Sequence, residues 1–253
     1  MTGDIALAAA GGIALLMIVV WLISLAAKDA SIVDIVWGLG FVLVAWIAWG
    51  RREGGDARSL LVAILTTVWG LRLAGYLAWR NLGKGEDFRY QAMRRRYGSR
   101  FGLISLFVVF GLQGVLMWIV SLPVQAASGG PLAWLDWVGV AVWFTGLGFE
   151  TIGDLQLAAF KRDPKNQGQV LDTGLWRYTR HPNYFGDFCV WWGLYLIAVA
   201  SGAWWAVVGP AVMTALLMRY SGAGLLEKSI GKRRPGYDEY VRRTNAFFPG
   251  PPR

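Results

Sequence analysis

The sequence predicts an all-α membrane protein: one polytopic bundle of about seven transmembrane helices that takes in residues 1–253. Of the 253 residues, 55% are hydrophobic and 15 are tryptophan. The apolar residues form long blocks instead of alternating with polar ones, and most cations lie between the blocks. A helix needs about 20 apolar residues to cross a hydrocarbon core of about 30 Å. Several blocks in this chain are long enough.

The first three predicted spans follow one another closely, at residues 5–27, 35–50 and 60–79. The first has no charged leader and no small-residue cleavage site, so we expect it to be a retained helix and not a signal peptide. The second is short and is extended by residues 29–34, which include Asp29 and Asp34. Only Arg72 interrupts the third span, and an arginine at such a depth is expected to face the interior of the bundle.

The uncharged stretch at residues 101–135 is too long for a single span. Two runs rich in turn residues, Ser121-Leu-Pro-Val and Ser128-Gly-Gly-Pro, divide it. Beyond them two further apolar blocks are separated by Ser201-Gly202. The remaining four spans are therefore predicted at residues 101–124, 131–160, 183–200 and 203–218.

The cations predict how these spans are oriented. Residues 80–100, 161–181 and 219–253 hold seven, five and eight of the 25 Lys and Arg. With seven spans these segments become two loops and a tail on one side, which the positive-inside tendency assigns to the cytoplasm. The N-terminus is then outside. The loop at 51–58 has three arginines on the predicted outer side, where Glu53 and Asp56 partly balance them.

Charge and cysteine content exclude several classes of function. The net charge of +9 does not indicate a nucleic-acid partner, because the cations lie beside membrane spans, where they favour anionic lipid. Cys189 is the only cysteine and His181 the only histidine, so we expect neither an intramolecular disulfide nor a metal site.

The fifth predicted span contains ionisable residues that are costly in a membrane. Each costs about 2.5–3.5 kcal/mol at the centre of a span on insertion scales. Glu150 and Asp154 have the spacing i, i+4, which places both carboxylates on one helix face, and Lys161 lies two turns further on. Such a stripe suits a dinucleotide, with carboxylates accepting from ribose or carboxamide groups and the lysine near phosphate. The structural alternative is that the acids pair with Arg72 and that Lys161 snorkels.

A second group of hydrogen-bonding residues lies where a polar loop enters the sixth span. Pro182 suits the first helical turn, where free N–H groups favour an anion. The alternative is an ordinary solvated loop at the start of a helix. The candidate cofactor-binding residues in this run are Arg177, Tyr178, Arg180, His181, Asn183, Tyr184 and Asp187.

In the C-terminal tail, basic residues alternate with tyrosines that could cover an adenine ring. This pattern predicts a second wall of a nucleotide site, although a lipid-facing amphipathic tail has the same pattern. The tail candidates are Glu227, Lys228, Arg233, Tyr237, Tyr240 and Arg243.

Four runs together resemble the superfamily of membrane steroid 5α-reductases and sterol reductases, in particular a bacterial branch of mostly unknown function. They are Asp34-Ile-Val-Trp-Gly, the run at residues 79–90 that ends in Glu-Asp-Phe-Arg-Tyr90, Arg180-His-Pro-Asn-Tyr-Phe-Gly, and the tail from Leu226-Glu-Lys to Phe-Phe-Pro249. The resemblance implies seven spans in a bacterial inner membrane. It also implies a site for NADPH that faces the cytoplasm, and hydride transfer to a carbon–carbon double bond.

The resemblance also assigns residues on the cofactor side. The reductases carry Asn, then Asp, then Arg in one span, and the matching positions here are Glu150, Asp154 and Lys161. Their next motif has an Asn and an acid that correspond to Asn183 and Asp187.

On the substrate side the match is weaker. The steroid enzymes hold the ketone with a Glu and with a Tyr three residues before an Arg; if Arg72 is that arginine, the tyrosine position is Trp69. Asp34 and Tyr76 are then expected to take over, with Arg72, in polarising the acceptor or delivering the proton. The expected substrate is a lipophilic small molecule of steroid, isoprenoid or fatty-acyl type.

Two other functions stay open. The same superfamily includes membrane methyltransferases that use S-adenosylmethionine, and these often have paired glutamates where this chain has Glu227 followed by Lys228. A non-enzymatic protein that binds membrane lipid is the third possibility. The oligomeric state is not predicted, and a monomer is compatible with the sequence.

Overall fold

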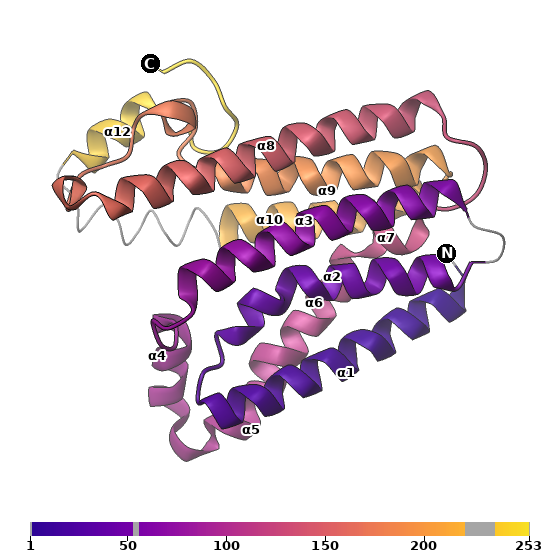
Figure 1. Ribbon diagram of the computed structural model, residues 1–253, viewed down its shortest axis with the longest axis horizontal. Helices are drawn as coiled ribbons and strands as arrows, with labels where there is room; N and C mark the ends of the chain where they lie inside the picture. Colours follow the sequence, from indigo (N-terminus) through magenta and orange to yellow (C-terminus); the bar gives the residue numbers. More distant parts are fainter. Residues whose placement is uncertain (1, 53–55, 221–235, 253) are drawn as a thin grey trace. The chain divides into compact units, whose positions relative to one another are not determined.

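The computed structural model describes residues 2–52, 56–220 and 236–252, and these residues form helices and no strand (Figure 1). This confirms the all-α prediction for the described part of the chain. Four helical segments there are long and apolar enough to cross a membrane: Gly3–Ala27, Ile32–Gly50, Ala57–Asn81 and Phe88–Val120. The protein is therefore an integral membrane protein. The chain forms two compact units, one made of Met1–Ala133 with Ile197–Val208 and the other of Trp134–Leu196 with Gly209–Arg253.

The first unit is built on α1 (Gly3–Ala27), α2 (Ile32–Gly50) and α3 (Ala57–Asn81), which lie side by side (Figure 1). Glycines allow α2 and α3 to approach closely. A Cβ atom at Gly38 would lie 2.5 Å from the carbonyl oxygen of Gly70. Helix α2 begins at Ile32, inside the predicted extension of the second span at residues 29–34, and so includes Asp34.

The fourth predicted span is preceded by a separate helix, α4 (Phe88–Tyr97). Gly98 ends α4 with a φ of 55°, a conformation that glycine adopts readily. After a short 3-10 turn the chain continues through α5 (Phe101–Ser105), a π-helical segment (Leu106–Gly111) and α6 (Leu112–Val120). The helix thus breaks at the predicted Ser121 turn, and α7 (Leu122–Ala126) follows.

The loop between α2 and α3 holds the loop after α7 in place. The Arg52 guanidinium donates to the Gln125 carbonyl at 2.7 Å and to the Ala127 carbonyl. Arg58, which is 2% exposed, donates to the Pro131 carbonyl at 2.7 Å and to that of Gly129. These carbonyls lie in and after the last turn of α7, where a helix has no partners of its own.

The second unit contains the long helix α8 (Trp134–Arg162), most of α9 (Pro182–Ala200) and α10 (Val208–Ala215), and α12 (Tyr237–Arg243). Glycines spaced seven residues apart line the contact between α8 and α9. A Cβ at Gly186 would lie 2.4 Å from the Glu150 nitrogen and 2.6 Å from the Gly146 oxygen. One at Gly193 would lie 2.7 Å from the Gly139 oxygen. The backbones of the two helices therefore touch.

Candidate functional site

The close contact between α8 and α9 buries the two acids of α8. Glu150 and Asp154 are each 4% exposed, and they share a helix face because they are one turn apart. Gly186 of α9 lies directly against the backbone of Glu150. A larger residue at Gly186 would push this face away from α9.

Asn183 joins the start of α9 to this acidic face. Its amide nitrogen donates to the Asp154 carboxylate at 3.1 Å. Pro182 begins α9, as the sequence predicts, and packs against Gly153 of α8, where an added Cβ would lie 3.1 Å from the proline ring. Asp187 follows Asn183 by one turn and is half-buried. The structure thus brings together two of the sequence-predicted site residues from segments that are far apart in the sequence.

His181 is a buried residue of the α9 entry. It is 4% exposed, and its ring stacks on that of Tyr184 with centroids 5.4 Å apart. Its backbone N–H donates to the Thr179 hydroxyl at 3.3 Å. These contacts fix the loop just before α9. A direct contact of His181 with a cofactor stays a prediction.

Arg180, one of the predicted anion-binding residues, holds the C-terminal tail. Its guanidinium donates to the carbonyls of Val241 and Thr244, both at 3.0 Å, and so caps the end of α12. Its backbone N–H donates to the Asn245 carbonyl at 2.9 Å. The Thr179 hydroxyl next to it donates to the Phe247 carbonyl at 2.7 Å.

Two tail candidates take part in the same docking. The Tyr240 hydroxyl donates to the Trp176 carbonyl at 2.6 Å, and Arg243 pairs with the Asp172 carboxylate. Burial raises the pKa of Tyr240 well above its ordinary value. Tyr237 is 6% exposed and packs on the Tyr240 ring. The contacts give Tyr240 and Arg243 a structural role, whereas their role toward a cofactor stays a prediction.

The other predicted residues of this site differ in accessibility. Arg177 and Tyr178 are exposed, and the Tyr178 carbonyl accepts from the Gly250 N–H at 3.1 Å. Glu227, Lys228 and Arg233 lie outside the described residues.

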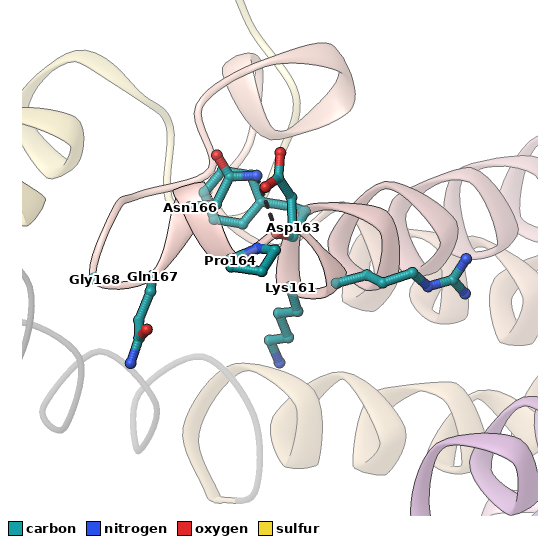
Figure 2. A pocket seen from close by; sticks show the side chains of 8 residues that line it. Lys161, Asp163, Pro164, Asn166, Gln167 and Gly168 are labelled. Carbon is teal, nitrogen blue, oxygen red and sulfur yellow. Dashed lines mark hydrogen bonds between the residues drawn. The ribbon is translucent and has the colours of Figure 1, made fainter.

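A cavity of about 290 Å³ lies at the end of α8. Lys161 and the turn that follows α8 line it, together with Phe160, Arg162, Asp163, Pro164, Asn166, Gln167 and Gly168. Figure 2 shows the Lys161 and Gln167 side chains extending in the same direction, with Asp163 and Asn166 on the other side of the turn. The Asp163 carboxylate accepts from the Lys165 N–H at 2.9 Å, and the Asn166 amide donates to the Phe160 carbonyl at 3.1 Å. The cavity thus offers a lysine and amide groups to a ligand.

A second polar cluster lies in the first unit, at the start of α2. The Asp34 carboxylate accepts from the Tyr90 hydroxyl at 2.7 Å and pairs with Arg89 at 2.7 Å. The Gln113 amide donates to the Tyr90 oxygen at 3.2 Å. Tyr90 is 6% exposed, and the Asp34 side chain to which it donates is 21% exposed.

The segment before α4 fixes this cluster. The Glu86 carboxylate accepts from the Ala30 N–H at 2.9 Å and pairs with Arg94 at 2.8 Å. Burial alone would raise the pKa of Glu86, but the hydrogen bonds from Arg94 and the Ala30 N–H lower this pKa below its ordinary value. At the sequence level, residues 79–90 contribute only to the family resemblance. The Glu-Asp-Phe-Arg-Tyr run at its end was the signal that these side chains have a local role.

Arg72 and Tyr76 meet on one face of α3. The Arg72 guanidinium lies 5.5 Å from the centroid of the Tyr76 ring, and that of Arg80 lies 5.7 Å from the same ring. The ring is therefore in contact with two cations, one turn away on either side. The predicted cooperation of these residues with Asp34 stays a prediction.

Fold and sites together define a helical membrane protein with buried carboxylates and hydrogen-bonded polar clusters in its helices. The chain belongs to the family described as protein of unknown function DUF1295, whose model matches residues 20–244. This family is part of the steroid 5α-reductase-like superfamily.

One relative is an uncharacterized protein of the fission yeast Schizosaccharomyces pombe (strain 972 / ATCC 24843). It is 25% identical over 269 aligned residues, which cover 91% of this chain and 76% of the yeast protein. The expected bacterial origin is not supported by this match. No solved structure matches the chain.

Proposed function

We propose that the protein is a membrane-embedded, NADPH-dependent reductase that reduces a carbon–carbon double bond of a lipophilic substrate. The observation that carries the proposal is the hydrogen bond from Asn183 to Asp154, next to the buried Glu150. The superfamily resemblance gives these three positions to the cofactor.

The residues of the second unit have the chemistry that NADPH requires. The Glu150 and Asp154 carboxylates can accept from ribose hydroxyls or from the carboxamide, and Asn183 keeps the Asp154 side chain in place. Lys161 lines a cavity at the end of α8, and Arg177 is exposed nearby in the sequence, so both are suited to phosphate. Arg180 and Arg243 also hold the tail and Asp172. NADPH would supply the hydride.

The reduction also needs a proton, and we assign its delivery to Asp34. The Tyr90 hydroxyl donates to this carboxylate at 2.7 Å and so fixes the position of the group that would carry the proton. Gln113 and Arg89 hold the pair in place. Arg72 with Tyr76 is the second candidate, because a cation beside the ring favours polarisation of an acceptor.

The proposed topology has seven spans, an outer N-terminus, a cytoplasmic tail and a cofactor that binds from the cytoplasm, in an inner or plasma membrane. The three arginines at residues 51–58 lie on the predicted outer side, which is contrary to the positive-inside tendency. Each of them has a local partner: Arg51 pairs with Asp4 at 2.8 Å, and Arg52 and Arg58 bind main-chain carbonyls.

Thermal unfolding of the purified protein with each cofactor tests the proposal. NADPH at 100 times its dissociation constant should raise the midpoint by about 5–10 °C, whereas S-adenosylmethionine should leave it unchanged. Asp154→Asn should abolish the shift, and Asp238→Asn, which removes an exposed carboxylate of α12, should keep it.

The opposite result would replace the proposal. A shift with S-adenosylmethionine and none with NADPH would make the protein a membrane methyltransferase. If neither cofactor shifts the midpoint and Asp154→Asn has no cellular phenotype, a non-enzymatic lipid-binding protein is the better description. Mass spectrometry of co-purifying lipids would then identify what it binds.

A further inference from the structure

The helix α4 has a face that none of the clusters above uses. It forms the first ten residues of the fourth candidate membrane span, Phe88–Val120, and Gly98, with a φ of 55°, separates it from the apolar helical run at residues 101–120. In Figure 1, α4 runs across the ends of α1 to α3 instead of continuing along them. A ten-residue helix with this direction is too short to span a membrane, and it lies where the adjoining spans end.

The segment that contains α4 has more cations than acids. Residues 80–100 have seven Lys or Arg but only two acids, Glu86 and Asp87. Both acids are engaged by neighbours: Glu86 binds Arg94 at 2.8 Å and Asp87 binds Arg89 at 2.8 Å. The acids therefore neutralise two of the arginines of α4, Arg89 and Arg94.

The outer face of α4 is both cationic and apolar. Phe88, Ala92, Arg95 and Arg96 share one face because they are four, seven and eight residues apart. All four are exposed, and the Phe88 ring is 73% exposed. The opposite face contains Tyr90, which is buried against the Asp34 cluster.

We propose that this outer face of α4 binds the headgroups of anionic phospholipids in the surrounding bilayer. Arginines attract the phosphate and make strong hydrogen bonds to it. An exposed phenylalanine beside them belongs at the boundary between headgroups and acyl chains, as in interfacial helices. Membrane-adjacent Lys and Arg clusters are recognised by anionic lipid in the same way. The bound lipid would hold α4, and with it Tyr90, at the start of α2.

Native mass spectrometry of the detergent-purified full-length protein tests this proposal. Phosphatidylglycerol and phosphatidylcholine with identical acyl chains are titrated in parallel. Arg95→Gln with Arg96→Gln should weaken phosphatidylglycerol binding by about 25-fold, about fivefold for each arginine, and leave phosphatidylcholine binding unchanged. The matched control, Lys165→Gln with Arg242→Gln, removes two exposed cations of the second unit and should keep the wild-type affinity. Lipid-free thermal unfolding checks that both variants are folded.

Three results would overturn the proposal. The first is wild-type phosphatidylglycerol affinity in the α4 variant. The second is an equal loss in the control variant, which would mean that net charge alone decides the affinity. The third is complete displacement of the lipid by inorganic phosphate at millimolar concentration, which would make the face a site for a soluble anion.

Discussion

Replacing Gly186 with alanine tests whether the touching backbones of α8 and α9 build the site. The new Cβ would lie 2.4 Å from the Glu150 nitrogen and 2.6 Å from the Gly146 oxygen. Backbone atoms cannot rotate away as a side chain can. The helices must therefore separate by about 1 Å to restore ordinary contact distances. Overpacking of this kind costs about 1–3 kcal/mol, which lowers the unfolding midpoint by roughly 2–12 °C.

The assay is thermal unfolding followed by tryptophan fluorescence, with NADPH binding as the second readout. Gly148→Ala is the matched control, because nothing lies within 4 Å of a Cβ at that position of the partner helix α8. Alanine there should be neutral or should stabilise by up to about 1 kcal/mol through its helix propensity. Equal midpoints for the Gly186 and Gly148 variants would refute the argument that the close backbone contact matters.

Three other changes have defined outcomes. Arg58→Met should lower the unfolding midpoint, since each lost hydrogen bond from a charged group is worth about 1.5–3 kcal/mol, and circular dichroism melts would check this. Tyr240→Phe should increase proteolysis of the tail by removing the bond to the Trp176 carbonyl, worth about 1 kcal/mol. Because the pKa of Tyr240 is raised, wild-type docking should weaken as pH rises above about 10, and the phenylalanine variant should lack this dependence. The pKa of Glu86 is lowered, so the stability it contributes should be lost as pH falls below about 4, a loss that Glu86→Gln removes in acid melts.

The helices could be predicted from the sequence because each long helix corresponds to a continuous block of apolar residues. Block boundaries at Ser121 and at the Ser128-Gly-Gly-Pro run follow from turn chemistry, and Gly129 and Gly130 do have positive φ values. Helix α4 was missed because its four arginines gave it the composition of a loop. Its buried face depends on neighbours that a local pattern does not identify.

Site prediction was limited by contacts between distant segments. The spacing of Glu150 and Asp154 placed them on one face, and the structure buries both. The partners of Asp34 come from more than fifty residues away, so that no spacing rule pointed to Tyr90. In the same way, Arg180 looked like an anion ligand by type, but its guanidinium caps a helix that lies sixty residues further along the chain.

Arg52 and Arg58 affect how the topology of this family can be studied. Their guanidinium groups bind the carbonyls at and after the end of α7, so these cations act as parts of the fold. Reporter fusions or charge-reversal scans that alter residues 51–58 would change assembly of the first unit together with its charge. An inverted or degraded product from such a scan would report a damaged loop. Insertion experiments on related proteins should therefore first vary the positions of the exposed Arg95 and Arg96.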